Sequence, residues 1–204
     1  MVQHNKKHSL LIIIHAEWRY IMNIPYNMNY TIHADSLREY PENREQMLKG
    51  IQYLKDKLDL EENIIDQAKL LGNIGAFLRI VNNLKEAEHY LLKAIKCCKQ
   101  ENNHLGLFIN QLRISHVYHW KQNYAKANQM FCELVKMVEN EPKYINYKDF
   151  VYQHYGKCLF DQKRLDEALI YFLEALRIRK DKKENLLIES SEKAIEKCKE
   201  KMRN

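Results

Sequence analysis

Residues 152–180 read YQHYGKCLFDQKRLDEALIYFLEALRIRK, and two earlier stretches of the chain follow the same pattern. A small residue, Gly156, stands in the first half, and Ala168 follows twelve positions later. The bulky Phe172 comes four residues after the alanine. A repeat period between about 20 and 50 residues indicates stacked supersecondary units. The copies begin 41 and then a further 40 residues earlier, at residues 111–139 and 71–99.

Each unit reads as two amphipathic helices joined by a short turn. Tyr152, Tyr155 and Leu159 fall on one stripe of the first helix, and the second helix has its own apolar stripe through Phe172. Small residues at facing positions, such as Gly156 opposite an alanine, allow two helices to approach closely. Such a pair has a second apolar face that must be covered by a neighbouring pair.

Composition agrees with an all-α fold. The 204 residues include only five glycines and three prolines, too few for the many turns of an all-β domain. The net charge of +6 is spread in mixed runs, which favours solvated helix faces over a nucleic-acid surface. The five cysteines form no CxxC pair. That pattern favours a soluble protein of the reducing cytoplasm.

The repeat resembles the tetratricopeptide repeat, with the pattern W-x2-L-G-x2-Y…A-x3-F…P. Tyr152, Gly156, Ala168 and Phe172 match its key positions in the best-preserved unit. Two departures stand out, because Lys180 occupies the closing proline position and the period is about 40 residues instead of 34. Similar lengthened repeats occur in kinesin-light-chain-like scaffolds and in bacterial receptors for signalling peptides. The resemblance implies an α-solenoid of stacked antiparallel helix pairs, a TPR-like superhelix.

The pattern divides the chain into four parts. Residues 65–180 hold three clear helix pairs, and residues 1–28 are poorly defined. Residues 29–64 are interpreted as a degenerate helical repeat, whose first helix would come from about residues 29–40. Residues 181–204 carry an amphipathic stripe with charged flanks, which is typical of a C-terminal capping helix.

The resemblance also implies where a ligand would bind, because the first helices of such pairs line a concave groove that holds peptides. The face opposite the small residues offers aromatic anchors and cationic or polar groups. Burial of Trp120 and Phe150 between units is an alternative explanation for their presence. Chaperone-type members clamp a terminal carboxylate with Lys and Asn, but Gly72 and Ala76 occupy those positions here. The candidate peptide-binding residues are Lys69, Arg79, His116, His119, Trp120, Phe150, Gln153 and Lys157.

No catalytic motif is present in the sequence, so we expect neither an enzyme nor a cofactor. His116, His119, His154 and Cys158 make a metal site conceivable, but helical spacing alone does not imply four converging ligands, and none is predicted. The sequence thus favours a non-enzymatic scaffold that binds a protein or peptide, without membrane or nucleic-acid partners. The alternative is a peptide-responsive bacterial regulator whose N-terminal region acts on DNA or a signalling protein. Self-association through a terminal repeat is a third possibility.

Overall fold

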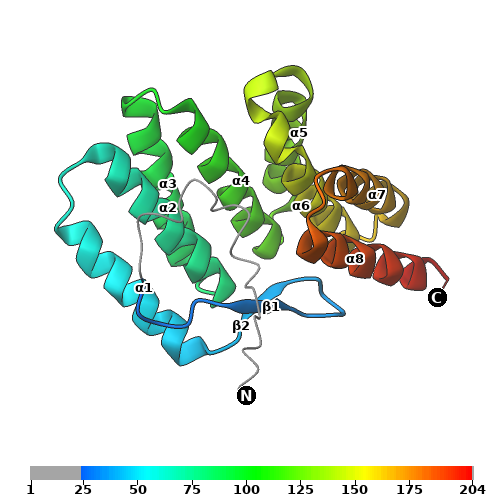
Figure 1. The fold of residues 1–204 in the computed structure, drawn as a ribbon, viewed down its shortest axis with the longest axis horizontal. Coiled ribbons are helices and arrows are strands. Elements are labelled where there is room, and N and C mark those ends of the chain that lie inside the picture. The colour runs from blue at the N-terminus through cyan, green and yellow to red at the C-terminus, as the bar shows by residue number, and fades with distance from the viewer. Residues whose placement is uncertain (1–23, 204) are drawn as a thin grey trace, which may run out of the picture.

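The structure, a computed structural model, describes residues 24–203. Its helices pack on their neighbours in chain order, and the prediction of an all-α solenoid is confirmed (Figure 1). No helix in the described part of the chain is long and apolar enough to cross a membrane. The elements are β1 (Tyr30–Ile32), β2 (Glu39–Pro41), α1 (Arg44–Asp59), α2 (Ile64–Ile80), α3 (Leu84–Gln100), α4 (His104–Trp120), α5 (Tyr124–Asn140), the 3-10 helix η2 (Pro142–Tyr147), α6 (Lys148–Asp161), α7 (Leu165–Asp181) and α8 (Asn185–Arg203).

Glycine permits the close approach within two of the helix pairs. A Cβ added to Gly75 of α2 would lie 2.5 Å from Cγ of Leu91 on α3. A Cβ added to Gly156 of α6 would lie 2.7 Å from two ring carbons of Phe172 on α7. Both distances are far below van der Waals contact, so any side chain at these positions would push the helices apart. The small residue of the repeat therefore sets the spacing between paired helices.

The turns after α2, α3, α4, α6 and α7 repeat one geometry, although none contains glycine. After α2, Asn82 adopts a left-handed conformation with φ of 63°. The backbone N–H of Asn83 then donates to the carbonyl of Leu78 at 2.8 Å, which closes a Schellman motif. This motif reverses the chain within three residues. Because the turn has the same length in each unit, the residues of the units align at a constant spacing. The equivalent left-handed residues after α3, α4, α6 and α7 are Asn102, Gln122, Lys163 and Lys183.

The expectation of a helix at residues 29–40 is wrong. This segment forms an antiparallel hairpin in which Tyr30 pairs with Pro41 and Ile32 pairs with Glu39. In its loop, Leu37 has a positive φ of 54° and is buried. A leucine rarely adopts this conformation, and burial of its side chain offsets the cost. Only the second half of the degenerate repeat is helical, as α1.

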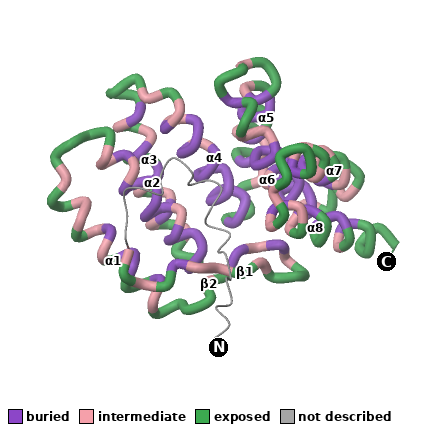
Figure 2. The backbone as a smooth tube through the Cα atoms, in the orientation of Figure 1, coloured by how far each residue is buried: buried purple, intermediate pink, exposed green. Residues whose placement is uncertain are grey.

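The hairpin lies across the array, between α1 and α8 in Figure 1. Buried positions follow α2, α4 and α6 along most of their length, as Figure 2 shows, whereas the outer helices are exposed on one side. The first helix of each pair is thus buried on two faces, one against its partner helix and one on the opposite side. The predicted poorly defined segment, residues 1–28, lies mostly outside the described residues.

A buried ion pair joins the last three helices. Arg179 of α7 donates to the carboxylate of Asp149 on α6 at 3.0 Å, and both side chains are almost fully buried. The same guanidinium donates to the hydroxyl of Ser191 on α8 at 2.7 Å. The carboxylate also accepts from Lys182 at 2.6 Å. These contacts fix α8 against the array, where it follows the third pair.

Candidate functional site

Seven of the eight candidate residues gather on one side of α2, α4 and α6, which we call the groove face. They come from the first helix of each pair. The repeat period of about 40 residues brings equivalent positions of successive pairs side by side. All seven are buried. The eighth, Lys69, is partly exposed near the start of α2 and pairs with Asp66 at 2.6 Å. The groove face consists of Arg79, His116, His119, Trp120, Phe150, Gln153 and Lys157.

The groove face is covered by the hairpin, and Glu39 is its central contact. One carboxylate oxygen accepts from Arg79 at 2.8 Å, and the other accepts from Lys157 at 3.1 Å. Glu39 itself is only 5% exposed. Burial alone would raise the pKa of this carboxyl, but Lys157 and Arg79 outweigh it and hold the pKa well below its usual value. The side chain is therefore a buried carboxylate shared by two cations from α2 and α6.

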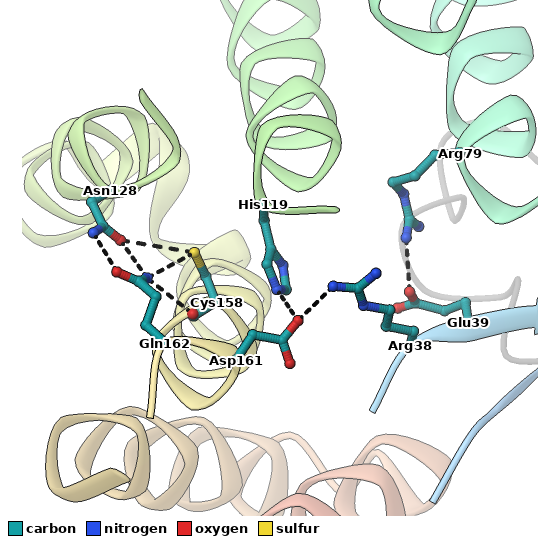
Figure 3. Close-up of polar contacts among 8 residues, drawn as sticks. All are labelled: Arg38, Glu39, Arg79, His119, Asn128, Cys158, Asp161 and Gln162. Carbon is teal, nitrogen blue, oxygen red and sulfur yellow. Dashed lines mark hydrogen bonds and ion pairs between the residues drawn. The ribbon is translucent and has the colours of Figure 1, made fainter. Parts of the chain in front are cut away.

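A second contact lies beside the first. Arg38 donates to Asp161 at 2.8 Å, and the same carboxylate oxygen contacts Nε2 of His119 at 2.9 Å (Figure 3). Burial would raise the pKa of Asp161, but His119 and Arg38 hold it below its usual value. The guanidinium groups of Arg38 and Arg79 lie 5.3 and 4.5 Å from the ring centre of Trp120. Two adjacent hairpin residues thus bind the groove face through opposite charges.

The histidines of this region are kept neutral by burial. The rings of His116 and His154 lie 3.8 Å apart, and burial followed by mutual repulsion lowers the pKa of His116 well below its usual value. Burial and the nearby Lys157 act likewise on the pKa of His154. Within residues 24–203 no three His, Cys, Asp or Glu side chains are grouped to hold a metal ion.

Cys158 lies on α6 away from the groove contacts. Its thiol contacts the amides of Asn128 and Gln162, which also bond to each other (Figure 3). Burial raises the pKa of the Cys158 thiol to about 12. A thiol that stays protonated at neutral pH is a poor nucleophile and a poor metal ligand. Its environment is that of a packed core residue.

A small pocket of about 80 Å³ remains between the hairpin and the helices. Its walls are largely apolar, and they include Tyr30 and Glu39 of the hairpin. Among the described residues, Nδ2 of Asn73 and Nε2 of His116 line it without a hydrogen-bond partner. Arg113, also in the wall, donates to the amide oxygen of Asn73 at 2.8 Å. Buried polar atoms of this kind are costly unless a ligand or water satisfies them.

Sequence reasoning missed the residues that cover the groove face. Arg38 and Glu39 stand in a segment that was expected to be helical, and no local pattern marks them as groove ligands. Arg113 was also missed, although it lies 40 residues after Asn73 and thus at the equivalent position of the next repeat. Repeat register is the signal that could have identified this pair.

Comparison with known families identifies two segments of the chain. Residues 68–104 and residues 151–182 each match a tetratricopeptide repeat model. The first match spans most of α2 and all of α3, and the second spans most of α6 and all of α7. No curated protein matches the chain.

Proposed function

The chain belongs to the tetratricopeptide-repeat family, and we propose that it is a non-catalytic interaction module whose groove face binds an extended segment of a partner protein. Repeats of this family generally mediate binding to protein partners. The observation that carries the proposal is the hairpin, because it is an extended segment bound to this face through Glu39. Aromatic and cationic side chains beside it are the residue types that dominate protein interfaces.

The chemistry of the face supports binding rather than catalysis. Its histidines are neutral and buried, and the carboxylates of Glu39 and Asp161 that contact it are each bonded to a cation. Burial lowers the pKa of Lys157, but its amino group is bonded to the carboxylate of Glu39. The five unpaired cysteines suit the proposed cytoplasmic location, where thiols stay reduced.

The alternative of a regulator with a DNA-binding N-terminal region gains no support from the described part of that region. Residues 24–62 contain the hairpin and the single helix α1, so they hold no helix-turn-helix pair. The hairpin instead bonds to the repeat array.

Photo-crosslinking tests the proposed function. Peptides selected on the wild-type protein from a random displayed library would be resynthesised with a benzophenone group and irradiated on the protein. Crosslinks should map to the groove-face sides of α2, α4 and α6. Crosslinks confined to the outer surfaces of α3, α5 and α7, or a failure of every selected peptide to bind in solution, would contradict the proposal.

A further inference from the structure

The hairpin is held to the groove face by ion pairs, and its own two-stranded ladder is short. Its strands have three residues each. An isolated two-stranded hairpin of this size is marginal in water, so its order depends on what it contacts. Side chains alternate along it, with Glu39 buried against the groove face and Tyr40 exposed. Its strongest anchor is therefore a carboxylate that another carboxylate could replace.

The groove face is strongly cationic once Glu39 is taken away. Arg79 and Lys157 both bond to this one carboxylate. Arg113 lies in the same pocket wall as Arg79, and their repulsion, after burial, lowers the pKa of Arg113 to about 10. Without Glu39, the buried Arg79 and Lys157 would lose the carboxylate that they share, which is unfavourable by several kcal/mol, so a segment that replaces the hairpin must be acidic. Asp161, in turn, accepts from a basic residue, Arg38.

We infer that the hairpin is an internal competitor of the partner, and that the partner segment carries a basic residue followed directly by an acidic one. These two side chains take the places of Arg38 on Asp161 and of Glu39 on Arg79 and Lys157. The inference rests on the proposed function and adds the chemistry of the partner. The groove face is then closed in the free protein and opens only by exchange of one extended segment for another.

The pocket beside the hairpin gives an incoming segment a place to begin. Its apolar walls include Phe77, Ile109 and Phe150, which suit an apolar side chain next to the charged pair. The unpartnered nitrogens of Asn73 and His116 can bond to the main chain of that segment. Since Glu39 forms part of the pocket wall, a segment bound there lies beside the contact that it must replace.

The hairpin sequence itself is the probe. A fluorescent peptide of residues 29–42, NYTIHADSLREYPE, would be titrated into the wild-type protein and into the Glu39→Gln variant. The variant weakens the internal contact with little change of shape, so the peptide should bind it at least about tenfold more tightly than wild type. The matched control is the same peptide with Gln at its own Glu39, which should bind the variant about tenfold more weakly than the acidic peptide.

A second variant covers the case in which Glu39→Gln does not fold. Asp35→Ala with Arg38→Ala removes the ion pairs to Lys197 and Asp161 but leaves the buried carboxylate in place. This protein should also bind the acidic peptide more tightly than wild type. Saturation of the wild-type protein with the peptide should, in addition, speed hydrogen exchange at the hairpin amides.

Equal binding of the acidic and Gln peptides, or equal affinity of all the protein variants, would overturn the inference. If selected peptides that lack an acidic residue crosslink to the groove face while the hairpin peptide does not bind, the inference fails and the proposed function stands. If no peptide of either kind binds, both fail.

Discussion

Replacement of Glu39 by glutamine should destabilise the protein markedly. The carboxylate is 5% exposed and bonds to Arg79 at 2.8 Å and to Lys157 at 3.1 Å. Loss of one partner from a buried ion pair costs about 3–5 kcal/mol, because the remaining charge stays buried without compensation. Glutamine keeps one oxygen that can accept a hydrogen bond, so we expect the lower end, about 3 kcal/mol. For a chain of this size that lowers the melting temperature by about 6–12 °C.

Thermal and urea unfolding, followed by circular dichroism, measure this loss. The matched control is Glu45→Gln, which removes an ion pair to Lys49 of 2.7 Å on the exposed surface of α1. The control should leave the unfolding midpoint unchanged, since exposed pairs are screened by water. Equal midpoints for the Glu39→Gln variant and the wild type would refute the reasoning, because the carboxylate could then not be the buried anchor of the hairpin.

Two further predictions concern packing and pH. Gly156→Ala should lower the free energy of unfolding in urea by about 1–3 kcal/mol, because the added Cβ would lie 2.7 Å from Phe172. This loss should outweigh the higher helix propensity of alanine, and a more stable variant would show that α6 and α7 do not touch there. Below pH about 6.5 the unfolded chain protonates His116 and His154 while the folded protein does not, so stability should fall by up to about 1.4 kcal/mol per pH unit for each ring. The pKa of Glu39 is lowered in the folded protein, so the contribution of Glu39 to stability is lost only below about pH 4.3, outside this range. A free energy of unfolding that does not change between pH 7 and 5 would therefore contradict the neutral state of the histidines.

The helix pairs could be predicted from sequence because their determinants are local. Gly156 and Phe172 belong to one unit, and the repeat shows them at the same spacing as Gly75 and Leu91. Repeat register likewise predicts that Arg79 and Lys157 lie on one side of the array, where both bond to Glu39. The turns carry no glycine, but the repeated spacing placed them without it.

The hairpin could not be predicted, because nothing local specifies it. Its three-residue strands are too short to show a reliable alternation. Glu39 is placed by Arg79 and Lys157, which lie 40 and 118 residues away in the chain. Leu37 supplies a left-handed turn residue where glycine or asparagine would have marked one. The segment that covers the candidate residues was thus missed, and their role in binding a peptide stays a prediction.

Hydrogen exchange at the hairpin tests most directly whether the groove face is occupied by the chain itself. The N–H of Leu37 donates to His33 and that of Glu42 donates to Asn29, both within the hairpin. The account predicts that these amides are protected in the wild-type protein and exchange at least about tenfold faster in Glu39→Gln, while amides in the middle of α4 are unchanged. Unprotected exchange of the hairpin amides in the wild-type protein would contradict it.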